Sequence, residues 1–192
     1  MPKKKSVKLA CDMFLSETAN IKGYPTTLPQ QRRSWAYEYA IIRLYREFEQ
    51  LILQALIGAV NNDTTTIQAR SGIQFPRHLS DEVCEYLIVG DGYFDLRGRS
   101  GLISTLKSFV PDGHYLVDVC KDARFKDHLE RLFAFRNYAA HASKKSKLQA
   151  KGAAGQVNMT SAGFWLGTQD RFEIICDGLA RLATELKGHA PY

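Results

Sequence analysis

The spacing of hydrophobic positions predicts helices along most of the chain. Between residues 35 and 60, apolar side chains recur every three or four positions, as on one face of a long amphipathic helix. The same spacing predicts a final helix over residues 169–187 and a short helix around Leu102 and Leu106. A first short helix is expected over residues 6–20. No stretch alternates apolar and polar residues over the length of a strand, so the chain is predicted to be all-α.

Capping and turn residues divide this pattern into separate elements. Ser34 resembles the N-cap of the long helix, and residues 61–63 should end it. Ser80, which two acidic residues follow, predicts the start of a short helix over residues 79–89. Residues 143–155 are rich in Lys, Ser, Gln, Gly and Ala, a composition typical of a mobile loop. We therefore expect one domain, built as a bundle of five or six helices.

The size and composition of the chain fit a single soluble domain. Its 192 residues, 45% of them hydrophobic and 24% charged, are enough for one sizeable core. We expect residues 1–33 to form a basic tail, a short helix and a loop, and residues 34–192 to form the bundle. No apolar stretch reaches the roughly 18 residues of a membrane span, and no signal-peptide pattern is present. A cytoplasmic protein without membrane association is expected.

The net charge of the chain and the spacing of its cysteines and histidines limit the ligands and partners that we expect. The four cysteines are far apart in the sequence and form no Cys-x-x-Cys pair, so we interpret them as buried thiols. The histidines also lack metal-ligand spacing, and we therefore expect no metal and no cofactor. The net charge of +6 favours an anionic partner, but it does not distinguish a nucleic acid from an acidic protein.

The most informative segment is residues 136–141, Arg-Asn-Tyr-Ala-Ala-His, in a helix predicted to begin near Ala123. Helical periodicity places Arg136 near the centre of an apolar face. That face carries Phe125, Leu129, Leu132, Phe133 and Ala140. A guanidinium in such a place needs a carboxylate or a phosphate partner, because its desolvation is costly. Asn137 and His141 lie four residues apart on one flank of the helix, and the three polar groups together suit a phosphate.

The geometry of a single helix separates two of these groups. Arg136 and His141 differ by about 140° around the helix and by about 7.5 Å along it, so one straight helix does not easily aim both at one atom. Two copies of the helix, packed across a two-fold axis, would line a shared cleft with two Arg and two His side chains. We therefore expect a homodimer with a composite site.

The pattern Arg-Asn-x-x-x-His, late in a helical protein and after a long amphipathic helix, resembles the HEPN superfamily of helical bundles, and within it the RiboL-PSP-HEPN type. Catalytic members carry Arg-x(4 to 6)-His, and Arg136, Asn137 and His141 fit the shortest spacing. The resemblance covers residues 34–187. It implies a metal-independent endoribonuclease that works as a homodimer in a toxin–antitoxin or antiviral defence system, with an antitoxin or defence partner. It also implies an acidic or polar residue from the long helix, for which Glu49 is the candidate by position.

The resemblance also implies a mechanism. His141 would act as general base or acid while a ribose 2′-hydroxyl attacks the adjacent phosphate, because an imidazole exchanges protons near neutral pH. Arg136 would stabilise the phosphorane, and Asn137 would position the phosphate or orient His141. The products would be a 2′,3′-cyclic phosphate and a 5′-hydroxyl, and DNA would not be cut. Some family toxins carry a Tyr that an antitoxin modifies two residues after the His, and Ser143 stands there instead.

Other residues allow more than one interpretation. Four lysines follow the motif, Lys144, Lys145, Lys147 and Lys151. They either hold RNA phosphates or lie on a solvated loop. Trp35, Tyr37 and Tyr39 could stack on bases, but their helical spacing favours the core. Two further functions stay open: a module that binds RNA or a nucleotide without cutting it, and a regulatory bundle in which Arg136 closes a buried ion pair.

Overall fold

The computed structural model describes residues 6–76 and 78–191, so the basic residues 1–5 lie outside it. Over the described residues it contains ten α-helices, two short 3-10 segments and no strand. The prediction of a single all-α domain is confirmed, and the predicted number of five or six helices is wrong. Within the same residues, no helix combines the length and the apolar character that crossing a membrane requires.

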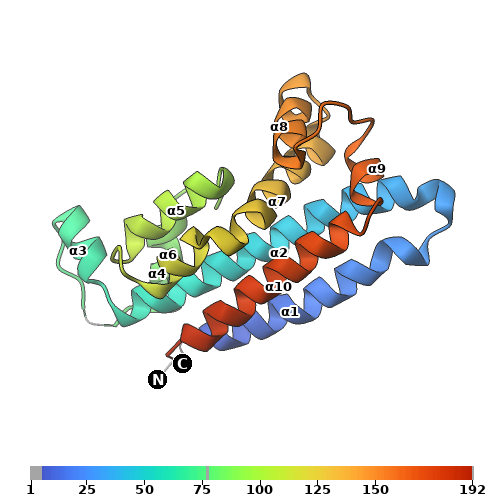
Figure 1. Cartoon of the computed structure of the whole chain (residues 1–192). Coiled ribbons are helices and arrows are strands. Elements are labelled where there is room, and N and C mark those ends of the chain that lie inside the picture. The colour runs from blue at the N-terminus through green and yellow to red at the C-terminus, as the bar shows by residue number, and fades with distance from the viewer. Residues whose placement is uncertain (1–5, 77, 192) are drawn as a thin grey trace.

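Four long helices form an up-down bundle (Figure 1). They are α1 (Val7–Gly23), α2 (Arg33–Asn62), α7 (Ala123–His141) and α10 (Arg171–His189). Helix α1 contacts α2 and α10, and α7 contacts the same two helices from the other side, so neighbouring helices in the ring run in opposite directions. The core between them includes the fully buried rings of Phe48, Phe135 and Phe172. The first helix therefore packs into the same core as the later ones.

The long helix predicted from apolar spacing is present, but it starts differently. It ends before Asp63 as predicted, where the backbone becomes extended. It begins at Arg33, directly after the 3-10 segment η2 (Gln30–Arg32), and Ser34 lies within its first turn. The N-cap prediction for Ser34 is therefore wrong, because the preceding 3-10 turn already brings the chain into helical geometry. The first helix is also confirmed, and it continues to Gly23, where η1 (Tyr24–Thr27) follows.

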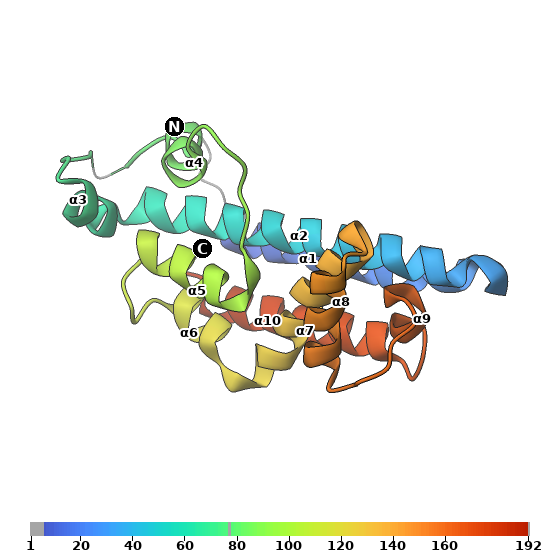
Figure 2. The ribbon, with the colours of Figure 1, turned by 90° about the horizontal axis from the view of Figure 1, so that it is seen from above.

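Two insertions interrupt the bundle at opposite ends (Figure 2). The first follows α2 and holds α3 (Thr65–Ser71), α4 (Asp81–Val89), α5 (Gly98–Phe109) and α6 (Tyr115–Lys121). The second follows α7 and holds α8 (Lys144–Ala154) and α9 (Ala162–Leu166). The predicted start of α4 is confirmed, because the Ser80 hydroxyl accepts a hydrogen bond from the Val83 amide. Helices α3, α6 and α9 were not predicted, because two turns or fewer carry too little periodicity.

The segment predicted as a mobile loop, residues 143–155, is helix α8. Ser143 and Ser146 form a capping box: each hydroxyl accepts a hydrogen bond from the other residue's backbone amide, both at 3.1 Å. Ser146 and Ala150, which lie one turn apart, are buried. The loop prediction is wrong because Ala, Lys and Gln are good helix formers, and because the cap fixes the first turn. The lysines after the motif thus stand on a regular helix.

All four cysteines of the chain are buried free thiols, as predicted. Burial raises the pKa of the Cys11 thiol to about 11 and that of the Cys120 thiol to about 12. These thiols are therefore protonated at neutral pH and serve as small apolar residues of the core.

Gly163 allows α9 to pack closely on the first turns of α2. A Cβ atom at this position would overlap the carbonyl oxygen of Ser34, which is backbone and cannot rotate away. The Gly163 amide also donates a hydrogen bond of 3.1 Å to Glu38 Oε1 on α2. The contact between α9 and α2 therefore depends on the missing side chain.

We expect Gly163→Ala to lower the free energy of unfolding by about 1–3 kcal/mol, as overpacking typically does. Urea denaturation measures it as a lower midpoint with an unchanged slope. Gly152→Ala is the matched control: this glycine is also helical, but a Cβ there meets nothing within 4 Å, so the change should be neutral or slightly stabilising. Equal stability of the two variants would contradict the close packing of α9.

Candidate functional site

The polar triplet lies in the last turns of α7, beside the start of α8. Helix α7 ends at His141, and Ala142 takes a left-handed conformation with a φ of 46°. The Ala142 amide still donates to the carbonyl of Tyr138, and α8 begins after Ser143. The chain therefore turns sharply between two helices, and the end of α7 is held against the start of α8.

Arg136, Asn137 and His141 line a single pocket of about 430 Å³. Its other walls come from α2, from the segment before α5, and from α8. Polar or aromatic side chains from these walls include Tyr45, Asp95, Arg97, Lys145 and Gln149. Arg136 and His141 point in different directions from α7, but the pocket is wide enough for both side chains to line it. One copy of the chain thus already brings the predicted triplet together.

Arg136 sits at the edge of the core and is half-buried. Its guanidinium lies over the Tyr45 ring, 4.4 Å from the ring centroid, and its Nη1 donates a hydrogen bond of 2.8 Å to Asn137 Oδ1. Among the described residues no carboxylate forms an ion pair with it, although arginine has five N–H donors. The buried ion pair that was the alternative for Arg136 is therefore not formed in this part of the chain.

The apolar face predicted around Arg136 is correct except at its end. Phe125, Leu129, Leu132 and Phe133 are buried, whereas Ala140 is exposed. The prediction for Ala140 is wrong because the last turn of α7 extends beyond the core. That same extension leaves His141 exposed, with no hydrogen bond to any described residue.

Two carboxylates lie close to Arg136 without touching it. The Tyr45 hydroxyl donates to Asp95 Oδ1 at 3.3 Å and also interacts with Glu49. Burial, together with these two carboxylates, raises the pKa of Tyr45. Burial also raises the pKa of Glu49, while the Tyr45 hydroxyl and the Arg136 charge oppose that rise. Glu49 is thus near Arg136, as its predicted role requires, but it is not one of the side chains that line the pocket.

The four lysines after the motif do not form one group. Lys145 lines the pocket with the triplet, whereas Lys147 and Lys151 line a second pocket and Lys144 lines neither of the two. Successive residues of a helix are about 100° apart, so residues 145 and 147 point to opposite sides of α8. Of these lysines, only Lys145 therefore lies in the pocket with the triplet, where it could hold a phosphate near the predicted scissile bond.

Several pocket residues were not predicted, because they are distant in the sequence. Tyr45 stands one turn before Glu49 on α2, and this spacing of four is the signal that could have suggested it. Asp95 and Arg97 come from an irregular segment, where Asp95 Oδ1 accepts from the Arg97 amide at 3.3 Å and Arg97 has a φ of 44°. Arg97, Arg136 and Lys145 outnumber the one carboxylate of the lining, Asp95. The pocket is therefore suited to an anion.

The aromatic residues at the start of α2 are only partly in the core. Tyr37 is buried, as predicted, but Trp35 is 72% and Tyr39 is 59% exposed. The core prediction is wrong for these two because the neighbouring segments cover only one side of the first turns of α2, where Tyr37 packs on Phe172 of α10. The Tyr39 ring lies 5.9 Å from the ring of Tyr24, centroid to centroid. None of these aromatic residues lines the pocket with the triplet.

The other histidines have structural contacts of their own. The His114 ring caps α6, since its Nδ1 accepts from the Leu116 amide at 3.3 Å, and burial lowers its pKa. His128 is half-buried, and burial together with Arg181 and Arg131 lowers its pKa as well. Within residues 6–76 and 78–191, no three His, Cys, Asp or Glu side chains are grouped as metal ligands would be.

Comparison with known proteins assigns the chain to no family. No family model, no curated protein and no solved structure matches the chain. The likeness to the HEPN superfamily is therefore carried by Arg136, Asn137 and His141 and by their place in a helical bundle. The function must be argued from the pocket itself.

Proposed function

We propose that the protein is an endoribonuclease of the HEPN type, which cuts RNA in the pocket formed by Arg136, Asn137 and His141. One observation carries the proposal. The pocket joins an exposed imidazole to a half-buried guanidinium that has no carboxylate ion pair among the described residues. A guanidinium held in this way has free donors for a phosphate, and the imidazole stands where it can exchange a proton with the same ligand.

In the proposed reaction, His141 removes the proton from a ribose 2′-hydroxyl, and the 2′-oxygen attacks the adjacent phosphorus. The bond from phosphorus to the 5′-oxygen then breaks, which leaves a 2′,3′-cyclic phosphate on one product and a 5′-hydroxyl on the other. The departing 5′-oxygen needs a proton from a second donor. In the homodimer that we propose, a second copy of His141 supplies it; in a monomer, water does.

Arg136 would bind the non-bridging oxygens, where negative charge increases in the transition state. The stack on Tyr45 and the hydrogen bond to Asn137 hold the guanidinium in place before RNA arrives, so less freedom is lost on binding. We assign Asn137 this positioning role. Glu49 would act through Tyr45 and through its charge near Arg136, as a positioning residue behind the pocket.

An enzyme that cuts RNA needs restraint in its own cell. By resemblance, we propose a toxin or antiviral defence effector that an antitoxin or another defence component controls. The position that some family toxins use for modification by the antitoxin is Ser143, which here caps α8. Restraint in this protein is therefore proposed to work through binding instead of modification of a tyrosine at that place.

The test is cleavage of single-stranded and structured RNA in excess EDTA, with chemical analysis of the product ends. We expect cleavage that persists in EDTA and yields 2′,3′-cyclic phosphates, and no cleavage where the 2′-hydroxyl of the cut nucleotide is replaced by hydrogen. Products with a 3′-hydroxyl, or activity that EDTA abolishes, would overturn the mechanism. Tight RNA binding without any cleavage would instead identify a non-catalytic RNA-binding module.

A further inference from the structure

A second pocket, of about 460 Å³, lies across α8 from the first one. It is formed by α8, the segment of residues 155–161, α9 and the start of α10. Its lining holds three cations, Lys147, Lys151 and Arg171, and no carboxylate. Like the first pocket, it is therefore suited to an anion.

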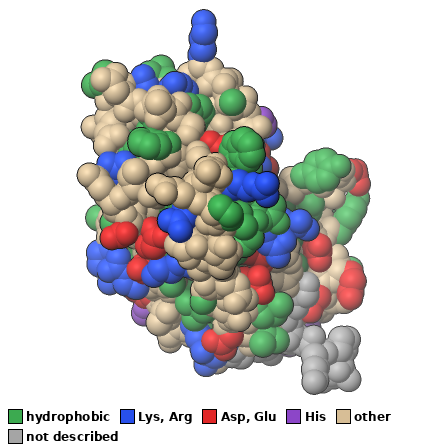
Figure 3. All heavy atoms as spheres, turned by 90° about the vertical axis from the view of Figure 1, so that its right-hand side faces the viewer, with side chains coloured by type: hydrophobic (Ala, Val, Ile, Leu, Met, Phe, Trp, Pro, Cys, Tyr) green, Lys and Arg blue, Asp and Glu red, His purple; other side chains and the backbone are tan. Residues whose placement is uncertain are grey.

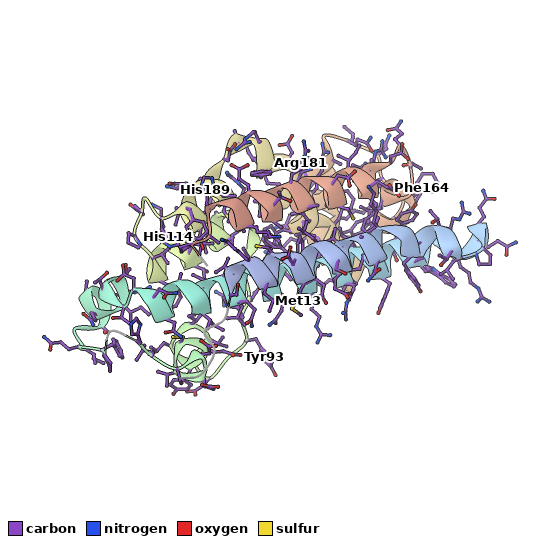
Figure 4. All side chains as sticks on the ribbon, turned by 90° about the horizontal axis from the view of Figure 1, so that it is seen from below. Met13, Tyr93, His114, Phe164, Arg181 and His189 are labelled. Atoms are coloured by element: carbon purple, nitrogen blue, oxygen red, sulfur yellow. The ribbon has the colours of Figure 1, made fainter. Side chains whose placement is uncertain are left out.

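One exposed aromatic side chain stands beside these cations. Phe164 lines the pocket and is 61% exposed, at the end of the bundle that carries α9 (Figure 4). Figure 3 shows this end of the molecule, where hydrophobic side chains lie next to those of Lys and Arg. An exposed ring next to positive charge is the arrangement on which proteins stack the bases of single-stranded nucleic acid.

The wall behind Phe164 is closely packed. The Trp165 ring is buried between the Phe135 ring, at a centroid distance of 4.1 Å, and the Arg171 guanidinium, 4.6 Å from the Trp165 centroid. Arg171 Nη1 donates to the Trp165 carbonyl at 3.3 Å and to Thr168 Oγ1 at 2.9 Å. These contacts hold the wall of the pocket in place before a ligand binds.

Helix α8 lies between the two pockets and carries lysines of both. Lys147 and Lys151 lie one turn apart on the side of α8 opposite Lys145. Lys147 Nζ makes a long hydrogen bond of 3.5 Å to the Thr160 carbonyl, and Lys151 forms no ion pair within the described chain. Residues 145 and 147 differ by about 3 Å along the helix axis, so both pockets flank the same turn of α8. An RNA strand that crosses this turn of α8 would join the two pockets.

We propose that the second pocket binds a further nucleotide of the RNA strand that is cut in the first pocket. Phe164 stacks on its base, and Lys147 and Lys151 bind its phosphate. The inference rests on the proposed function, because RNA is the ligand of both pockets. The inference can nevertheless be tested separately from cleavage, because the second pocket would contribute to RNA affinity whether or not the first pocket cuts RNA.

The experiment is fluorescence anisotropy with a short labelled single-stranded RNA, in the His141→Ala background so that the probe stays intact. We expect Phe164→Ala to weaken binding roughly 5- to 150-fold, which corresponds to the about 1–3 kcal/mol of one base–aromatic stack. Lys151→Gln should reduce the slope of log affinity against log salt by about 1. The matched control is Tyr93→Ala, which removes a 98% exposed ring that Figure 4 places well away from Phe164.

The outcomes separate this inference from the proposed function. Cleavage by wild type together with equal RNA affinity of Phe164→Ala and Tyr93→Ala would overturn the second pocket and leave the enzyme intact. Loss of affinity in Phe164→Ala without any cleavage by wild type would support the second pocket in a protein that only binds RNA. Absence of RNA binding by wild type and by His141→Ala would overturn both the second pocket and the proposed function. Because Phe164 is mostly exposed, its replacement should leave the thermal unfolding midpoint unchanged, which circular dichroism verifies.

Discussion

Replacement of His141 by alanine is expected to lower the rate of RNA cleavage about 10²- to 10⁴-fold, the usual contribution of a general acid or base. The reason is that His141 is the one imidazole in the lining of the Arg136 pocket. The change should barely affect the fold, because the side chain is exposed at the end of α7 and makes no hydrogen bond to a described residue. Single-turnover cleavage at saturating protein concentration measures the loss.

His189 offers a closely matched control for this experiment. Like His141, it is an exposed histidine at the last position of a 19-residue helix, but it lies at the other end of the bundle (Figure 4). His189→Ala should therefore cut RNA at the wild-type rate. If the two variants were equally active, the imidazole in the pocket would have no part in the chemistry, and the proposed site would be refuted.

Arg136→Ala is expected to reduce cleavage about 10²- to 10³-fold, as does the removal of one donor that stabilises a transition-state oxyanion. Arg136→Lys should recover little of that loss. A lysine keeps the charge, but it lacks the planar fork that binds two phosphate oxygens and stacks on the Tyr45 ring. Arg131→Lys, on the same helix but outside the pocket, should leave the rate unchanged.

The same Arg136 variants distinguish a catalytic residue from a structural one. Loss of the stack on Tyr45 should lower the free energy of unfolding by about 0.5–2 kcal/mol. Rupture of a buried ion pair would cost about 3–5 kcal/mol, and no such pair with Arg136 is present among the described residues. Urea denaturation of Arg136→Ala measures this difference. A loss in the larger range, with cleavage unchanged, would assign Arg136 a structural role and refute its part in the chemistry.

Much of the helical architecture could be predicted because its signals are local. The long helix α2 and the last helix α10 carry apolar residues at helical spacing over many turns, and both are present. Ser80 and its two following acids marked the start of α4 correctly. Helix α8 was not predicted, because the composition of residues 143–155 resembles that of a loop, although Ser143 and Ser146 stand at capping-box spacing.

Only part of the candidate site could be predicted from the sequence. Arg136, Asn137 and His141 lie within six consecutive residues, so a pattern of residue types could find them. Lys145, four residues after His141, could be found in the same way, whereas Tyr45 and Asp95 come from segments at least about 40 residues from the motif, and no local pattern links them to it. The exposure of Trp35 and Tyr39 was also hidden, because helical spacing shows which residues share a face but not how far the neighbouring helices extend over it.

By itself, the sequence determined that the chain is all-helical, where its long helices lie, and which three polar residues stand together at the end of α7. These properties depend on backbone hydrogen bonds, caps and side-chain spacing within a few residues. Only the tertiary structure decided that Arg136 rests on Tyr45 without a carboxylate ion pair among the described residues, and that α8 separates two cationic pockets. Such properties arise because folding packs segments that are distant in the sequence, and this packing decides which side chains are buried together.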